Sequence, residues 1–457
     1  MSENNIIVAE ATPRGVGAIS IVRLSGDNCF TVAKSFMSGL PEDNPPESGK
    51  VCLVNLVDGE KVIDKATVVF YKSPYSYTGE DMVEIFCHGS PAIVSTIVSI
   101  AESLGARRAR AGEFTKRAFI NGKVDIITAE AINSLTRSMT KVGSSIAMSV
   151  MKGNLKTVIG DISKGMLLIQ ALIEAIIEYE EDIPVEGTMK RVNTELNELI
   201  KQLQRIEASY GAFKVLSGGA NVVIVGRKNA GKTTLFNRML GYERGIVSEH
   251  PGTTRDYIRE PLHLGDDYLI YLTDIAGLGE VSDDIDMMAT ESARGVISNA
   301  DILIFLVDVQ YGWGGIEDKI LGSLSDKEIV YVVSRADLCE EGVVKVFKKV
   351  ESITGCKPIV ISSITMQGID ELRERVRAIM SSLSKIGTFL VSERQRELVW
   401  EMIIHLKRVV NLIERGEGIE MVAEEMRCAI RCLELFEGRG YTDEMIDKIF
   451  EEFCVGK

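Results

Sequence analysis

The chain has 457 residues, of which 45% are hydrophobic and 26% charged, and its formal net charge is -14. This length exceeds what one hydrophobic core supports, so we expect about two to four domains. The acidic balance argues against a general nucleic-acid coat, although the basic run at 107–117 allows a local patch. No apolar run approaches the roughly 18 residues of a membrane span, and the N-terminus lacks the order of a signal peptide, so a cytoplasmic location is predicted.

The N-terminal part, residues 1–121, mixes strand-like runs with one helix-like stretch. The runs at 17–24, 66–71 and 82–89 are rich in β-branched residues, whereas 91–105 has helical spacing. This mixture predicts an α+β domain.

The rest of the chain changes character twice. Residues 122–217 are helical in pattern, with long stretches such as 147–181, and the helical pattern returns at 381–457. Between them, at 218–380, short β-branched runs alternate with helical segments, which is typical of a doubly wound parallel sheet. We therefore predict an α/β nucleotide-binding domain inserted into a discontinuous helical domain.

A phosphate-binding loop is predicted at Gly226–Thr233, "GRKNAGKT", which matches G-x-x-x-x-G-K-[ST] in full. It follows a strand and precedes a helix, as the motif requires. Backbone N–H groups and the helix N-terminus would surround the phosphates. Lys232 would reach the β- and γ-phosphates, and the Thr233 hydroxyl would ligate Mg²⁺.

Later motifs resemble those of the translation-factor-like GTPases. Asp274–Gly277, "DIAG", is similar to their D-x-x-G, and Gly252–Asp256, "GTTRD", is similar to their first switch, with Thr254 as a second hydroxyl on Mg²⁺. Ser334–Asp337, "SRAD", stands where they carry N-K-x-D, so Asp337 would accept both N–H groups of guanine.

The base-recognition motif departs from that pattern. Ser334 replaces the usual Asn or Thr, Arg335 replaces Lys, and Ser362–Ile364 stands where S-A-K is common. Guanine is favoured with weaker affinity, and an ATPase is the alternative.

Further stretches resemble the MnmE (TrmE) family of tRNA-modification GTPases over essentially the whole length. They are "IVAEATPRGVGAISIVRLSG", "GEFTKRAFINGKVDIITAEAI", "GRKNAGKTTLFN", "PGTTRD" and "FCVGK". The resemblance implies an N-terminal folate-binding and dimerisation domain (1–121), a helical domain in two parts (122–217 and 381–457), and an inserted Ras-like GTPase domain (218–380).

The resemblance also implies partners and chemistry. Proteins of this family are homodimers that work with a flavoprotein, MnmG, to place an aminomethyl or carboxymethylaminomethyl group on carbon 5 of the wobble uridine of certain tRNAs. The carbon comes from a folate such as 5-formyltetrahydrofolate, and GTP hydrolysis brings the two GTPase domains together.

K⁺ would replace an arginine finger in stabilising charge on the transferring phosphoryl group. The marker is an Asn in the phosphate loop, here Asn229; the alternative is that Asn229 only caps the turn. The other K⁺ ligands implied are Ser248, His250 and Thr253. The family's water-orienting Glu, twelve residues after Asp274, is replaced by Asp286, which is the candidate catalytic residue.

The full set of GTP-binding positions implied by the resemblance covers the phosphate loop, both switches and the base motif. These are Asn229, Ala230, Gly231, Lys232, Thr233, Thr234, Ser248, Glu249, His250, Pro251, Gly252, Thr253, Thr254, Asp274, Ile275, Ala276, Gly277, Ser334, Arg335, Ala336 and Asp337.

Folate-binding candidates carried over from the family are Arg23, Glu84, Lys123 and Lys457. Each taken singly has an ordinary explanation, such as a surface cation or a strand-end carboxylate. The terminal "CVGK" makes Cys454 a candidate catalytic or substrate-positioning thiol, with a buried structural cysteine as the alternative. A prenylation signal does not fit, because Gly456 is not aliphatic and Lys457 is not a usual final residue.

Two functions of other classes stay open beside the leading one. A GTP-switched assembly module with little turnover is suggested by Ser334 and Asp286. A GTP-regulated folate one-carbon transferase is the other.

Overall fold

The computed structural model describes residues 6–40, 47–179, 184–241, 258–275, 291–322, 324 and 327–456. The chain forms two compact units. The first comprises Met1–Asn133, Ser163–Asn193 and Glu401–Lys457, and the second comprises Ser134–Ile162 and Thr194–Trp400. Within the described ranges, no helix has both the length and the apolar character needed to cross a membrane.

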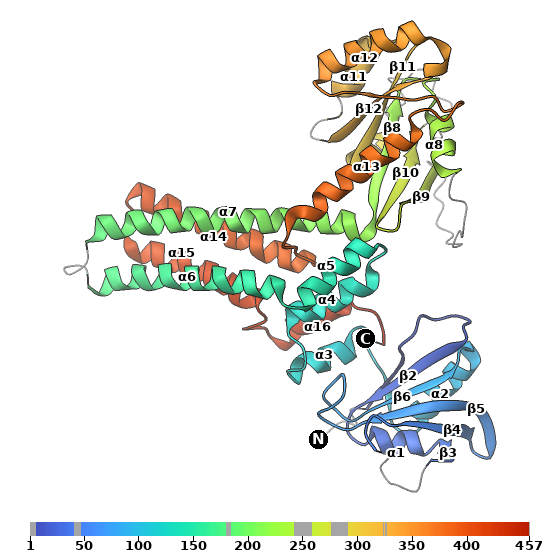
Figure 1. Cartoon of the computed structure of the whole chain (residues 1–457). Helices are drawn as coiled ribbons and strands as arrows, with labels where there is room; N and C mark the ends of the chain where they lie inside the picture. The colour runs from blue at the N-terminus through green and yellow to red at the C-terminus, as the bar shows by residue number, and fades with distance from the viewer. Residues whose placement is uncertain are drawn as a thin grey trace. The chain divides into compact units, whose positions relative to one another are not determined.

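The first unit contains a seven-stranded sheet in the order β3-β4-β5-β6-β2-β1-β7 (Figure 1). The strands are β1 (Ile7–Glu10), β2 (Ile19–Ser25), β3 (Met37–Ser38), β4 (Val51–Asp58), β5 (Lys61–Tyr71), β6 (Met82–His88) and β7 (Arg107–Arg108). Neighbours are antiparallel except β1 and β7. Alternate residues of β6 (Val83, Ile85 and Cys87) enter a core shared with α1 (Cys29–Lys34) and α2 (Pro91–Ser103), which confirms the predicted α+β class.

Further helices belong to this unit. They include α3 (Glu113–Ile120) and, near the C-terminus, α15 (Ile419–Phe436) and α16 (Asp443–Glu451). Lys116 of α3 is 2.5 Å from Asp447 of α16, and the rings of Phe119 and Phe450 lie 6.1 Å apart. Charge pairing and aromatic packing thus join α16, which carries the C-terminal tail, to α3.

The divisions of the chain between the two units fall within four further helices, which are α4 (Ile126–Arg137), α6 (Asn154–Glu178), α7 (Val185–Gly218) and α14 (Glu393–Arg415). The helical stretch predicted at 147–181 is not continuous, because α5 (Lys141–Met151) ends before α6 begins. The break falls at Gly153, whose φ of 95° lies outside helical backbone.

The second unit contains a six-stranded sheet in the order β13-β12-β11-β8-β10-β9. Its strands are β8 (Ala220–Gly226), β9 (Ile258–Leu264), β10 (Tyr268–Asp274), β11 (Ile302–Asp308), β12 (Glu328–Ser334) and β13 (Ile359–Val360). All pairs are parallel except β9 with β10.

The helices of this sheet are α8 (Lys232–Leu240), α10 (Glu291–Ser298), α11 (Gly315–Gly322), α12 (Glu340–Thr354) and α13 (Ile369–Leu383). Side chains of α10, α11 and α12 share one core with β8 and β11. The predicted doubly wound α/β fold is confirmed. The parallel strands end together, so the residues after β8, β10, β11 and β12 meet at one edge of the sheet.

Candidate functional site

The predicted phosphate loop lies between β8 and α8 at the edge where the parallel strands end. Gly226 has a φ of 150°, and a Cβ atom there would stand 2.7 Å from the Leu306 carbonyl oxygen of β11. Asn229 is exposed and left-handed, with a φ of 64°. Turns of this kind point N–H groups inward and form an anion-binding nest. The loop therefore fits nucleotide phosphates at the positive end of α8.

Lys232 and Thr233 begin α8 and contact the groups that the motif pairs with them. Lys232 is 6% exposed, and its Nζ donates to the main-chain oxygens of Gly226 at 2.8 Å and Arg227 at 2.9 Å. Thr233 Oγ1 donates to Asp274 Oδ2 at 2.6 Å, and Asp274 is buried. Hydroxyl and carboxylate oxygens are the ligands that Mg²⁺ prefers, so this pair fits that ion.

Ser334 links the base-recognition segment to the phosphate loop. Its hydroxyl, buried at the end of β12, donates to the main-chain oxygen of Ala230 at 2.8 Å. A serine therefore makes one direct tether at the position where Asn or Thr is usual.

Arg335 and Asp337, which follow Ser334 in the same motif, also make contacts that hold their side chains. Arg335 is left-handed, with a φ of 60°, and its Nη1 lies 2.9 Å from the buried Oδ2 of Asp308. Asp337 is exposed, and its Oδ1 accepts a hydrogen bond of 2.5 Å from the buried Ser362 hydroxyl. That bond orients the carboxylate, which fits a group meant to accept from two adjacent N–H donors of one base.

The remaining predicted nucleotide positions divide into two groups. Thr234 is exposed on α8, while Ile275 and Ala336 are buried. The positions that lie outside the described residues are Ser248, Glu249, His250, Pro251, Gly252, Thr253, Thr254, Ala276, Gly277 and Asp286, together with Lys457 at the chain end.

Two of the predicted folate residues, Arg23 and Glu84, lie directly opposite each other on β2 and β6. Arg23 Nε and Nη2 donate to Glu84 Oε1 at 2.9 and 2.7 Å, and the Tyr71 hydroxyl donates to Glu84 Oε2 at 3.3 Å. The guanidinium carbon is 5.4 Å from the Tyr77 ring centroid and 5.5 Å from that of Phe114. Charged groups flanked by aromatic rings fit a flat, polar ring system.

Lys123 has a different environment. Its Nζ donates to the main-chain oxygen of Pro74 at 2.9 Å. Among the described residues, no hydrogen bond or ion pair joins Lys123 to Arg23 or Glu84.

The C-terminal tail runs beside the Arg23–Glu84 pair. The Cys454 main-chain oxygen accepts a hydrogen bond from Gly112 N at 3.2 Å, and Val455 pairs with Ala111 in an isolated antiparallel bridge. Gly456 O accepts from Arg23 Nη1 at 3.4 Å. The Cys454 side chain is a free, exposed thiol.

Sequence reasoning did not single out the ring of Tyr77 beside Arg23, nor the ion pair between Arg227 of the phosphate loop and Glu317 of α11. Both depend on contacts between segments far apart in the chain. The only local signal was a cation placed directly after the first glycine of the loop.

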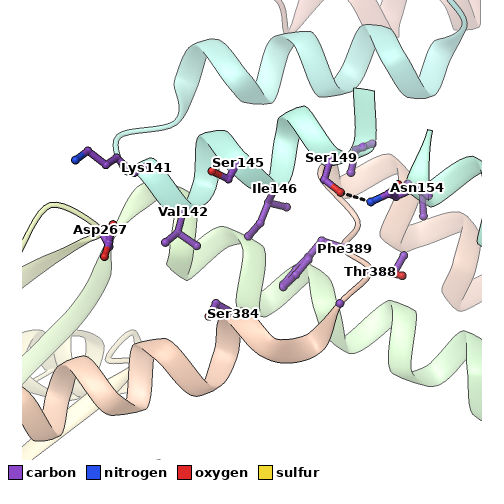
Figure 2. Close-up of a pocket in the computed structure, with 13 residues that line it drawn as sticks. Lys141, Val142, Ser145, Ile146, Ser149, Asn154, Asp267, Ser384, Thr388 and Phe389 are labelled. Carbon is purple, nitrogen blue, oxygen red and sulfur yellow. Dashed lines mark hydrogen bonds between the residues drawn. The ribbon is translucent and has the colours of Figure 1, made fainter. Parts of the chain in front are cut away.

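The second unit also contains a cavity of about 340 Å³ (Figure 2). It opens between α5 and the segment that follows α13, with Val142, Ile146 and Phe389 forming apolar walls and Ser145 and Ser384 facing it from the two sides. None of the predicted site residues lines it.

Family models match nearly the whole chain. One described as the GTP-binding protein TrmE N-terminus covers residues 6–123, and one described as the MnmE helical domain covers residues 126–454.

Relatives named "tRNA modification GTPase MnmE" match from end to end. The protein of Chlorobium phaeobacteroides is 34% identical over 99% of this chain and 97% of its own length. That of Pseudothermotoga lettingae is 31% identical over 99% of both chains. Among solved structures, Era of Aquifex aeolicus bound to GDP and AlF₄⁻ covers 41% of this chain and 66% of its own, with 23% identity and a TM-score of 0.29.

Proposed function

The chain belongs to the MnmE family of tRNA modification GTPases, and from this premise we propose that it is a K⁺-stimulated GTPase that modifies the wobble uridine of certain tRNAs together with a flavoprotein, MnmG. GTP hydrolysis in tRNA modification is the activity of the family. The cation, the folate and the protein partners are the finer parts of the proposal.

One observation carries the nucleotide site: Lys232, Thr233, Asp274 and Asp337 gather at the edge where the parallel strands end. Lys232 Nζ would bind phosphate oxygens, and Asp337 would accept from the base. Thr233 and Asp274 would hold Mg²⁺, which when bound supplies positive charge between the β- and γ-phosphates.

Asn229 supports the role of K⁺. It lies in the phosphate loop with left-handed backbone and an exposed side chain. A monovalent cation there would supply the charge that an arginine finger supplies elsewhere. The switch residues Ser248, His250 and Thr253 would complete the site.

Turnover in KCl and NaCl at equal ionic strength tests this part. We expect GTP hydrolysis at least about tenfold faster in KCl, and an Asn229→Ala variant that has lost most of this difference. Equally slow hydrolysis in both salts would favour the alternative function, a GTP-switched assembly module with little turnover. Ser334 and Asp286, which differ from the residues usual in the family, suggest that alternative.

Folate binding is supported by the Arg23–Glu84 pair, its aromatic neighbours and the tail that contacts Arg23. Titration calorimetry with 5-formyltetrahydrofolate should show binding that Arg23→Ala abolishes. Arg108→Ala is a matched control, because Arg108 is an exposed cation of the same sheet paired with Glu102. Equal affinity in the Arg23→Ala variant would remove the folate site.

Partner binding rests on the family and on charge. The net charge of -14 suggests that a partner supplies much of the surface that meets tRNA. Light scattering should give a mass near twice 50.2 kDa for the proposed homodimer. A mass that stays at one chain at every concentration would contradict it.

A further inference from the structure

We propose that Arg227 is a positioning residue of the phosphate loop, whose guanidinium clamps the loop to the segment that follows β11. The inference rests on the nucleotide site of the proposed function and adds to it a residue with no phosphate contact of its own. Arg227 directly follows Gly226, and its main-chain oxygen is one of the two that hold Lys232 Nζ.

An ion pair with Glu317 forms the first half of the clamp. Arg227 Nε lies 3.3 Å from Glu317 Oε1, and the two side chains are only 17% and 1% exposed. Glu317 lies in the first turn of α11, and its Oε2 accepts a hydrogen bond from Gly314 N at 2.9 Å.

The second carboxylate oxygen of Glu317 depends on Arg227. Within the described part of the chain, the buried Oε1 accepts no hydrogen bond of good geometry. Attraction to the Arg227 charge is therefore what compensates its burial. Breaking a buried pair by removing one partner is strongly unfavourable, because a charge is left behind.

Tyr311 forms the second half of the clamp. The Arg227 guanidinium carbon lies 4.6 Å from the Tyr311 ring centroid, within the range of a cation–π contact. The planar guanidinium can stack on a ring and face a carboxylate with its edge at once, which a lysine ammonium cannot do.

The clamp fixes the start of a loop whose later residues include the left-handed Asn229. A loop held in its binding conformation loses less entropy when it closes on a ligand. The loop surrounds phosphates that GTP and GDP share, so loss of the clamp should weaken both nucleotides alike and chiefly speed their release.

Stopped-flow measurement of fluorescent GTP and GDP analogues with the full chain tests this. For Arg227→Gln we expect Kd to rise about tenfold for both nucleotides, while kcat at saturating GTP changes less than about threefold. Arg227→Lys should fall in between. Arg259→Gln is the matched control, because Arg259 stacks on Tyr271 at 4.0 Å and bonds to Asn221 outside the loop.

A double-mutant cycle with Glu317→Gln adds a readout that general destabilisation would not produce. If the two residues act as one clamp, the double variant binds no more weakly than Arg227→Gln alone, because Glu317→Gln removes only a contact that Arg227→Gln has already lost; effects that multiply would overturn the proposal. An Arg227→Gln Kd within about twofold of the parent would overturn it as well.

Loss of nucleotide binding by the unmodified chain and misfolding of the Arg227→Gln variant have different consequences for the proposal. If the unmodified chain bound neither nucleotide, the proposed function would fail and the clamp with it. If Arg227→Gln did not fold, Tyr311→Leu, at a ring that is 62% exposed, should still release nucleotide about two- to threefold faster, and an unchanged release rate would overturn the clamp.

Discussion

Replacing Gly456 by Ala should detach the C-terminal tail while leaving the rest of the fold intact. Gly456 has a φ of 91°, and a Cβ atom there would stand 2.2 Å from Glu10 O and 2.8 Å from Ala11 Cα. Both are backbone atoms of the segment beginning with β1, so they cannot rotate away as a side chain could. The tail must move instead.

The structure gives the magnitude of what holds the tail. Among the described residues, two hydrogen bonds do so, from Gly112 N to Cys454 O at 3.2 Å and from Arg23 Nη1 to Gly456 O at 3.4 Å. At a net value of about 1 kcal/mol each, they contribute on the order of 2 kcal/mol. A heavy-atom overlap at 2.2 Å costs more than this. Loss of the contacts should therefore raise the open population about 30-fold.

Hydrogen exchange at the Gly112 amide reports this opening directly. We expect exchange about 30-fold faster in the Gly456→Ala variant, with little change in Tm because the contacts that are lost lie at the C-terminal end of the described chain. Gly440→Ala is the control: Gly440 also has a positive φ, of 77°, but a Cβ there meets nothing within 4 Å. Unchanged protection of Gly112 in Gly456→Ala, or equal loss in Gly440→Ala, would refute the reasoning.

Three other changes have defined outcomes. Ser334→Ala removes the bond to Ala230 O and should cost about 1–3 kcal/mol, seen as weaker GDP binding by calorimetry; a Kd within about twofold of the parent would contradict this. Burial raises the pKa of Glu113. Hydrogen bonds from Arg107 and the Arg110 amide, with the nearby arginine charges, lower this pKa by more than burial raises it, so the net pKa lies below the ordinary 4.5. The stabilisation that this carboxylate provides is therefore present above pH 4.5 and is lost as the pH falls through the lowered native pKa. The Glu113→Gln variant should be less stable at pH 7, and its free energy of unfolding, measured by denaturant titration, should change less as the pH falls into the acid range. Parallel curves of unfolding free energy against pH for the two proteins would contradict this. Cys454→Ser should keep GTP hydrolysis and lose tRNA modification, and full modification would assign Cys454 a structural role.

The fold was largely predictable because its strands are local and strongly patterned. The β-branched runs at 221–226, 268–274 and 301–309 each begin and end within one residue of β8, β10 and β11. β9 matches no predicted run, and it contains Pro261, a residue that is unfavourable inside a strand. It is an edge strand, antiparallel to β10, where a missing N–H is tolerated.

The site was predictable only where its residues are close in sequence. The phosphate loop is one continuous motif, so its position followed from the letters alone. The Arg23–Glu84 pairing depends on strand register, and the contact between Arg23 and Gly456 joins positions at opposite ends of the chain. No periodicity encodes such contacts. The resemblance to a family placed these residues in one site, whereas their geometry required the structure.

Nucleoside mass spectrometry of total tRNA tests the proposed function most directly. A strain lacking this protein should lose the 5-carboxymethylaminomethyl or aminomethyl group of the wobble uridine. The wild-type gene should restore it, and a Lys232→Ala gene, which removes the phosphate-binding ammonium, should not. An unchanged nucleoside profile after deletion would contradict a role in wobble-uridine modification.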